Sequence, residues 1–429
     1  MTQPVSIAVV GAGNRGQTYA DLAAADGRAQ VVAVADPDYV RREELADRHA
    51  VAADRRFDGW EALLSGPRIA DVVVVATQDR LHYEPAVALL ARGYHLLLEK
   101  PIATTPEQCD DIVEAAERAG ATFAVCHVMR YAPYSLTLQG LLNSGRIGEL
   151  VSVEHLEPIG WWHFAHSFVR GNWRREDESS FMLLAKCVHD IDWLSHLIGR
   201  PARRVSSFGG LYHFRADQRP DDAADRCLDC VLQESCPYSA LKIYLPCLGD
   251  HGWERWPLRT VTSDLTVEGV LAALRDGPYG RCVYACDNDV VDHQVVSIEY
   301  EGGVTASFTA TAFTGYQFRR TKLFGTHGCI EGDGKVLDLL DFRTGRRERV
   351  PIPTVDVPKG LERHGGGDAG LIRAFLDALV SGDPAAHLPD PRQALAAHHL
   401  TWAAEQARLT ASVVDLVGRR STPSGPGHS

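Results

Sequence analysis

The chain has 429 residues, which is long for one domain and favours two domains with a sizeable hydrophobic core. Its formal net charge of −12 argues against nucleic acid as the main partner, because a phosphate-binding surface usually shows a basic excess or stripe. The longest apolar runs, such as 72–76, are too short to span a bilayer, and the N-terminus lacks a signal-peptide pattern. We therefore expect a soluble cytoplasmic protein with no membrane partner.

Short apolar strands alternate with helix-patterned segments up to about residue 125. This alternation predicts a doubly wound parallel sheet of the Rossmann type, with helices on both faces, over residues 1–125. The predicted strands are 5–10, 30–35, 71–75, 94–98 and 121–125, and the predicted helices are 15–26, 39–48, 82–92 and 106–119.

A glycine-rich turn follows the first predicted strand and opens the first helix. In it, Gly11 permits the tight turn, Gly13 lets backbone amides approach a pyrophosphate, and Gly16 lets the helix pack close to its strand. Asp36 stands 20 residues after Gly16, at the end of the next strand, where a carboxylate accepts hydrogen bonds from a ribose 2′-hydroxyl. The pattern predicts a dinucleotide site. Asp36 favours NAD over NADP, and Arg41 and Arg42 lie close enough to soften that preference.

After residue 125 the hydrophobic pattern changes to the strand period. Alternation of this kind predicts a C-terminal α+β domain, residues 126–420, built on an open and largely antiparallel sheet. One face of such a sheet is commonly free, so we expect a homodimer or homotetramer. The predicted elements are strands at 151–155, 204–210, 292–300, 304–312 and 321–324, an insertion at 213–260, closing helices at 368–382 and 391–417, and a disordered tail at 421–429.

Five motifs, in the same order along the chain, resemble those of a known family. They are the Gly11–Gly16 turn, Ala35-Asp36-Pro37, Ala76-Thr77 with His82, Glu99-Lys100-Pro101, and a helix ending in His189-Asp190-Ile191-Asp192. Together they resemble the Gfo/Idh/MocA oxidoreductases. The resemblance implies NAD(P)-linked redox chemistry on sugars or cyclitols. The predicted cofactor-binding residues are Gly11, Gly13, Asn14, Arg15, Gly16, Asp36, Arg41, Ala76, Thr77, His82, Glu99, Lys100 and Pro101.

Lys100 follows a predicted strand and emerges at the carboxyl edge of the sheet, where the nicotinamide is expected. The resemblance implies that this lysine contacts the nicotinamide ribose and the substrate hydroxyl. A cation there could lower the pKa of an alcohol and stabilise the developing alkoxide. The alternative is a surface ion pair with Glu99.

The helix before His189 departs from the family pattern. Relatives commonly carry an aspartate four residues before this histidine, and here Ala185 occupies that position. Lys186 faces the same side of the helix as His189, and its ammonium could keep the imidazole neutral at pH 7. We therefore predict Lys100, Lys186 and His189 as catalytic residues. The alternative is that His189 only fills the helix and that Lys186 is solvated.

Aromatic and guanidinium side chains cluster in predicted loops upstream of this helix. Aromatic faces pack against sugar rings, and arginine forks bind anionic groups, although ordinary packing or surface charge explains both equally well. The predicted substrate-binding residues are Arg130, Tyr131, Trp162, His163, Asn172, Trp173, Arg174, Lys186 and His189.

Cys227-x-x-Cys230 and Cys236 fall within the predicted insertion. Two thiolates separated by two residues can grip one tetrahedral ion, so we predict structural zinc with Cys282 as the fourth ligand. The insertion resembles a Cys-rich insertion found in a subgroup of the family. Competing fourth ligands are Cys286, Cys247 and His251, and the alternative is free thiols.

Three functions are compatible with these residues. The first is NAD(P)-dependent transfer of a hydride between a hydroxyl carbon of a sugar, sugar derivative or cyclitol and nicotinamide. The second is an NAD-dependent oxidoreductive glycosidase that oxidises C3 transiently, eliminates the aglycone, adds water and re-reduces the product, on a substrate class that includes anionic sugars. The third is a non-catalytic NAD-binding regulatory protein, supported only by Ala185.

Overall fold

The computed structural model describes residues 3–357, 360–361 and 363–416. Its N-terminal part holds a six-stranded parallel sheet in the order β3-β2-β1-β4-β5-β6, which confirms the predicted doubly wound fold. The strands are β1 (Val5–Val10), β2 (Ala29–Ala35), β3 (Arg56–Phe57), β4 (Val72–Val75), β5 (His95–Leu98) and β6 (Phe123–Val125). The helices are α1 (Asn14–Asp26), α2 (Tyr39–Arg48), α3 (Tyr83–Ala91) and α4 (Pro106–Ala119).

Local sequence explains where these helices begin. The Asp38 side chain accepts a hydrogen bond from the backbone N–H of Arg41 and caps α2, and Thr105 caps α4 ahead of Pro106. By contrast, α1 begins after Gly13, which supplies no side-chain cap. The first amides of α1 are therefore available to a ligand at the helix N-terminus.

The C-terminal part is built on a nine-stranded sheet in the order β14-β13-β12-β11-β7-β10-β9-β8-β15. Among the described strands of this sheet, only β7 and β10 pair in parallel, so the predicted antiparallel character is confirmed. The strands are β7 (Leu150–Pro158), β8 (Ala202–Gly210), β9 (His293–Tyr300), β10 (Thr305–Thr311), β11 (Arg320–Gly325), β12 (Gly328–Gly332), β13 (Leu337–Asp341), β14 (Arg347–Val350) and β15 (Val414–Asp415).

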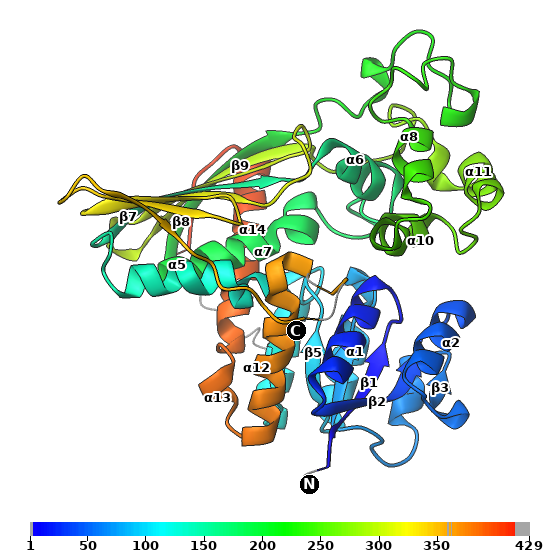
Figure 1. The fold of residues 1–429 in the computed structure, drawn as a ribbon, viewed down its shortest axis with the longest axis horizontal. Coiled ribbons are helices and arrows are strands. Elements are labelled where there is room, and N and C mark those ends of the chain that lie inside the picture. Colours follow the sequence, from blue (N-terminus) through cyan, green and yellow to red (C-terminus); the bar gives the residue numbers. More distant parts are fainter. Residues whose placement is uncertain (1–2, 358–359, 362, 417–429) are drawn as a thin grey trace, which may run out of the picture.

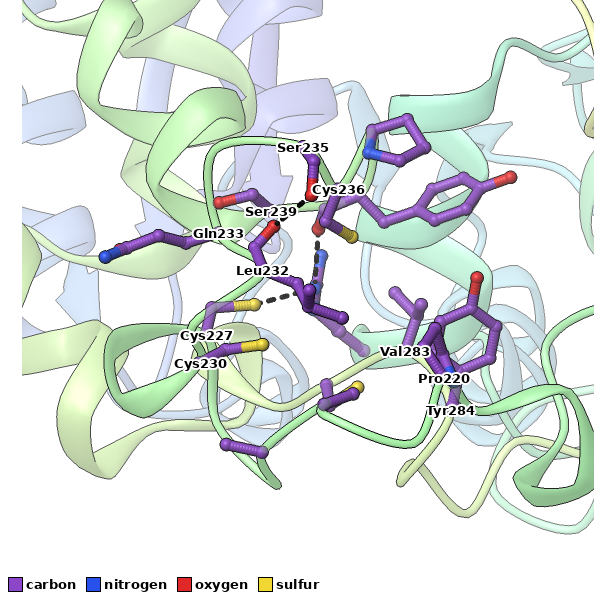
Figure 2. Close-up of a pocket in the computed structure, with 16 residues that line it drawn as sticks. Pro220, Cys227, Cys230, Leu232, Gln233, Ser235, Cys236, Ser239, Val283 and Tyr284 are labelled. Atoms are coloured by element: carbon purple, nitrogen blue, oxygen red, sulfur yellow. Dashed lines mark hydrogen bonds between the residues drawn. The ribbon is translucent and has the colours of Figure 1, made fainter.

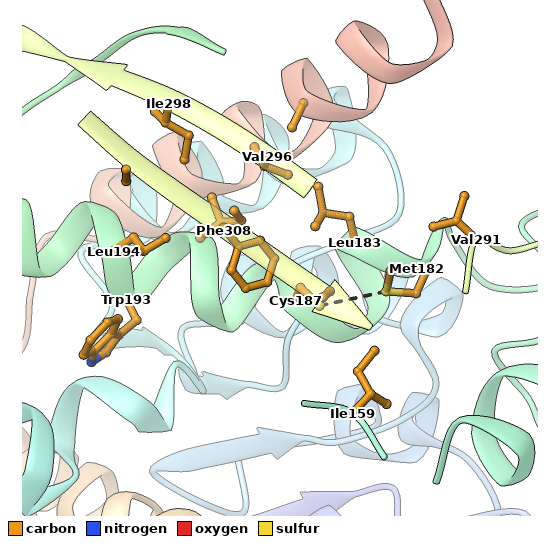
Figure 3. Packing of buried hydrophobic residues seen from close by; sticks show 14 of the residues in the cluster. Ile159, Met182, Leu183, Cys187, Trp193, Leu194, Val291, Val296, Ile298 and Phe308 are labelled. Carbon is orange, nitrogen blue, oxygen red and sulfur yellow. Dashed lines mark hydrogen bonds between the residues drawn. The ribbon is translucent and has the colours of Figure 1, made fainter. Parts of the chain in front are cut away.

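Helices α5 (Pro133–Asn143), α7 (Met182–Ile198) and α14 (Pro391–Thr410) cover one face of this sheet (Figure 1). Phe308 and Val296 of the sheet pack with Leu183 and Leu194 of α7 in one buried cluster (Figure 3). Burying side chains of this size contributes about 1.5–3 kcal/mol each, so α7 is held firmly to the sheet.

The predicted helix 391–417 was too long at its C-terminal end. Helix α14 ends at Thr410, because Ala411 adopts a left-handed conformation with φ 48° and Val414–Asp415 then pair with β8 as β15. Strands β3 and β12 to β14 were not predicted. The predicted tail at 421–429 lies outside the described residues.

The insertion between β8 and β9 is longer than the predicted 213–260. Its own buried cluster reaches Val270, Leu274 and Tyr279, and it carries α8 (Ala240–Tyr244), α9 (His251–Trp253), α10 (Arg259–Val261) and α11 (Val267–Asp276). Figure 1 shows it beside the N-terminal domain, next to α1 and α2. Two ion pairs cross this junction, from Arg255 to Asp21 at 3.2 Å and from Arg259 to Glu44 at 3.1 Å.

The chain returns to the N-terminal domain near its end. Helix α12 (Gly367–Ser381) buries Ile372 and Phe375 in the same cluster as Ile7 and Val9 of β1. The sequence limits 1–125 and 126–420 therefore do not separate two independent bodies in space. In the described part of the chain, no helix is both long and apolar enough to cross a membrane.

Candidate active site

The glycine turn has the geometry that a dinucleotide requires. Gly11 has φ +92°, and a Cβ there would lie 2.5 Å from the carbonyl oxygen of Ala76, while a Cβ on Gly16 would lie 1.9 Å from the carbonyl oxygen of Gly11. A Cβ added to Gly13, in contrast, would meet nothing within 4 Å, so the space beside this backbone is open. The Asn14 Oδ1 atom is buried without a hydrogen-bond partner. These residues fit a pyrophosphate at the N-terminus of α1.

The Asp36 carboxylate lies beside the same turn. It accepts hydrogen bonds from the backbone N–H of Ala12 at 2.6 Å and of Asp38 at 2.8 Å. Arg41 pairs with Asp38 at 3.4 Å, and Arg42 donates to the Asp36 carbonyl at 2.8 Å. Both arginines are therefore engaged locally.

Arg15 and Glu99, both predicted to bind the cofactor, contact each other. Arg15 Nε donates to Glu99 Oε1 at 2.6 Å, the Tyr19 hydroxyl donates to the same oxygen at 2.7 Å, and Arg15 also pairs with Asp368 of α12. Burial alone would raise the pKa of Glu99, but Arg15 and Lys100 hold it below its usual value. This network joins the glycine turn, the end of β5 and α12.

His82 links two strand ends. Its Nδ1 lies 2.7 Å from the carbonyl oxygen of Pro101, and its Nε2 lies 3.2 Å from that of Thr77. The ring is fully buried. It therefore braces the segments that carry Thr77 and Lys100.

Lys100 extends from the end of β5 to α7. Its Nζ donates to the carbonyl oxygen of Ala185 at 2.5 Å, which places the ammonium one helical turn before His189. Burial lowers the pKa of Lys100 from its ordinary value, partly offset by the carboxylates of Asp79 and Glu99. The surface ion pair considered from the sequence does not describe this position.

His189 is 7% exposed, and its Nδ1 has no hydrogen-bond partner. Burial lowers its pKa well below 6.5, and Lys100, His127 and His364 lower it further. The expected neutral imidazole is thus supported, but Lys100 rather than Lys186 is the main cationic cause. Lys186 instead lies 3.1 Å from Glu157 Oε1, which raises its pKa despite burial.

Three of the predicted substrate residues lie in a ring cluster or near Lys100. Trp162 and His163 lie in a ring cluster with Tyr316 and, from the insertion, Trp256, with centroids 4.9–5.6 Å apart. Trp173 donates from Nε1 to Asp79 at 3.1 Å, close to Lys100.

Four other predicted substrate residues make contacts outside this cluster or lie at the surface. Arg130 forms a buried bidentate ion pair with Asp192, because both carboxylate oxygens accept from its guanidinium. Tyr131 packs its backbone against α12, and Arg174 bonds to Asp287 on the surface. Asn172 is exposed.

Other groups in this region were missed from the sequence. Arg319 pairs with Glu157 at 2.7 Å and with Asp190 at 2.8 Å, next to Lys186. His364 lies just before α12 and Asp368 lies in its first turn, and the His364 ring lies 6.1 Å from the His189 ring. In the sequence, only the run His364-Gly-Gly-Gly-Asp368 could have pointed to His364 and Asp368.

The four cysteines predicted to bind zinc line one cavity of about 210 Å³ in the insertion (Figure 2). Arg170 donates to Cys227 Sγ at 3.4 Å. Within the described residues, no three histidine, cysteine or acidic side chains are arranged to hold a metal ion as they stand. The competing thiols Cys286 and Cys247 donate to backbone carbonyls, and the His251 side chain lies outside the described structure.

An open glycine turn, an acidic strand end and a lysine that reaches from the same sheet edge to the helix of His189 define an NAD-binding oxidoreductase. Two family models match the chain: the oxidoreductase family with an NAD-binding Rossmann fold over residues 5–127, and its C-terminal alpha/beta domain over residues 139–416. The chain belongs to the Gfo/Idh/MocA oxidoreductase family.

Several relatives are named for carbohydrate substrates. The 2,7-anhydro-N-acetylneuraminate hydratase of Escherichia coli is 31% identical over 48% of this chain and 53% of its own length. The D-glucoside 3-dehydrogenase of the same organism is 26% identical over 47% and 56%. The chain thus matches about half the length of each. A levoglucosan dehydrogenase crystallised with NADH and L-sorbose shares the fold, with a TM-score of 0.71 at 18% identity over 97% and 99% of the two chains.

Proposed function

We propose that this protein transfers a hydride between bound NAD and a hydroxyl-bearing carbon of a sugar, sugar derivative or cyclitol. NAD held at the glycine turn would supply the hydride acceptor, its nicotinamide ring. Lys100 stabilises the oxygen from which the proton leaves, and the neutral imidazole of His189 takes that proton. The contact between Lys100 Nζ and the Ala185 carbonyl carries the proposal, because it brings the ammonium to the helix that presents His189.

The ring cluster at Trp162 supports a sugar-like substrate. Trp162, Trp256 and Tyr316 can pack against the apolar face of a pyranose or cyclitol ring. The neighbouring cations Lys186 and Arg319 are balanced by Glu157 and Asp190. This balance favours a neutral substrate over an anionic one.

NAD is the preferred cofactor in this proposal. A 2′-phosphate would face the Asp36 carboxylate, and the two nearby arginines are already engaged by Asp38 and by the Asp36 carbonyl. NADP would need these contacts to rearrange.

A second candidate is redox-assisted cleavage or hydration, in which NAD is reduced and reoxidised within one turnover. The hydratase relative supports it, and so do the ion pairs from the insertion to α1 and α2, which favour retention of the cofactor. Lys100 and His189 would serve the oxidation step in the same way.

The insertion and the free sheet face support two further proposals. We infer that Cys227, Cys230, Cys236 and Cys282 hold structural zinc after small rotations of their side chains, because all four line one cavity and every cysteine of the chain is a free thiol, as in a reducing cytoplasm. We also infer a homodimer or homotetramer. Phe208, 70% exposed, and Val295, 40% exposed, are paired on the uncovered sheet face.

Absorbance at 340 nm with a panel of free sugars, cyclitols and aryl glycosides tests the proposed activity. NADH that accumulates with a free sugar or cyclitol supports the dehydrogenase. Aglycone release without net NADH supports the second candidate. NAD binding without either reaction would overturn both and leave a regulatory protein.

A further inference from the structure

His364 and Asp368 form a hydrogen-bonded pair just before and within the first turn of α12. His364 Nδ1 lies 2.7 Å from Asp368 Oδ2. An ionised carboxylate can only accept, so the proton of this bond sits on Nδ1, and Nε2 is the ring nitrogen available for proton transfer. Asp368 is fully buried, whereas the His364 side chain is 33% exposed. A buried anion therefore orients a ring that a substrate can reach.

The backbone around His364 is unusual for a non-glycine residue. It has φ +49°, in the left-handed region, and Gly365 and Gly366 follow it with φ +62° and +89°. A Cβ on Gly367 would lie 2.3 Å from the carbonyl oxygen of Val128, so the segment is pressed against the turn that follows β6. Left-handed non-glycine residues cluster at functional sites, where the surrounding structure enforces them.

This pair faces the groups already assigned to hydride transfer. The His364 ring lies 6.1 Å from the ring of His189. On the other side, Asp368 pairs with Arg15 of the dinucleotide turn. The pair thus lies between the cofactor turn and the predicted base, although nothing in the oxidation step requires a second histidine.

We propose that His364 is a further catalytic acid/base, oriented by Asp368, which moves the proton on the carbon next to the oxidised one. This inference rests on the oxidation step of the proposed function and deepens its second candidate, redox-assisted cleavage or hydration. Oxidation leaves a carbonyl, which makes the neighbouring C–H bond acidic. His364 Nε2 takes that proton, the C–H electron pair becomes the C=C bond, and the C–O bond one carbon further along breaks, with the departing oxygen taking a proton from solvent. Water adds by the reverse steps, and His364 returns its proton.

Hydrogen exchange into a sugar that already carries the ketone isolates this step. Methyl 3-keto-glucopyranoside needs no net redox change to exchange the protons beside its carbonyl. We expect the NAD-bound protein in D₂O to exchange one of these protons, measured by ¹H NMR, and His364→Asn to slow the exchange at least about 100-fold. Asparagine is chosen because it tolerates the left-handed backbone. His399→Asn is the matched control, since His399 is similarly exposed and lies 2.9 Å from Asp110.

A second readout needs no turnover. In the ¹⁵N spectrum of the imidazoles, His364 should show a protonated Nδ1 in the wild type, and Asp368→Asn should change that signature and slow exchange about 10-fold. Exchange in His364→Asn at the wild-type rate would overturn the proposal, as would a wild-type protein that binds the keto sugar without exchanging it. Failure of the proposed function is a separate result, because reduction of the keto sugar by NADH would then be lost in the wild type as well.

Discussion

Lys100 Nζ donates a hydrogen bond to the carbonyl oxygen of Ala185, at the helix position where relatives commonly carry a carboxylate. The ammonium therefore contacts a backbone dipole instead of an anion, and burial lowers its pKa. The same ammonium helps to keep His189 neutral. One lysine thus serves both the developing alkoxide and the base.

Alanine substitutions at Gly13 and Gly16 should differ in their effects on NAD affinity and on thermal stability. Gly13→Ala meets no atom within 4 Å, so we expect little change in thermal stability but NAD affinity about 10-fold lower or worse, because a methyl group enters the phosphate space. Gly16→Ala meets the Gly11 carbonyl at 1.9 Å and should lower both. Thermal unfolding and calorimetric NAD titration measure the two effects. Equal loss of stability in both variants would contradict this assignment.

Acid should destabilise the fold below about pH 6.5. Burial lowers the pKa of His127 to about 4 and of His166 and His398 to about 3. Because the unfolded histidines bind protons near pH 6.5, the unfolded state holds more protons between pH 6.5 and 4, so the free energy of unfolding falls as pH falls through this window. The loss is about 1–2 kcal/mol per histidine at pH 5.

Urea unfolding at pH 7.5 and 5.0 checks this dependence. His127→Gln removes a titrating ring whose two nitrogens have no hydrogen-bond partner, and it should reduce the pH dependence. The exposed-histidine variant His399→Asn should leave it unchanged. A free energy of unfolding that is equal at both pH values would rule the explanation out.

The insertion should slow the release of NAD. Arg255 reaches Asp21 and Thr18 of α1, the helix whose N-terminus fits the phosphates. Partly exposed ion pairs contribute about 0.5–1 kcal/mol, so Arg255→Ala should raise the dissociation rate of NAD roughly two- to fivefold. Stopped-flow displacement of the cofactor measures the rate. Arg349→Ala, which breaks a surface pair with Asp338, is the control and should have no effect.

Metal analysis of the purified protein tests the cysteine cavity. We expect about one zinc per chain, and its loss in Cys227→Ser, together with lower stability of the insertion. Cys109→Ser changes a buried thiol in the N-terminal domain, bonded to the Ala103 carbonyl, and should keep the metal. A wild-type protein without metal would show that the four thiols are free.

The parts of the site that could be predicted are those in which position along the chain fixes position in space. Gly11 follows β1 and Asp36 follows β2 in one parallel sheet, so their spacing along the chain is enough to predict that they lie close together. Lys100 ends another strand of that sheet. Lys186 could be placed on the His189 face of its helix, but the distant Glu157 that pairs with it could not.

Contacts that depend on the closing segment were not predictable. His364 reaches His189 only because the chain returns and packs α12 onto the N-terminal sheet, and no local period encodes that return. The end of α14 was missed for a related reason, since pairing of Val414 with β8 outweighs the helical pattern. Tertiary contacts therefore determine both the position of His364 and the end of α14.

The most direct test of the central claim is single-turnover reduction of bound NAD at 340 nm with a sugar or cyclitol that the wild type oxidises. We expect Lys100→Met to slow this step by about 10²–10⁴-fold while NAD binds with an affinity within about tenfold of the wild type. NAD reduction at the wild-type rate in Lys100→Met would contradict the account.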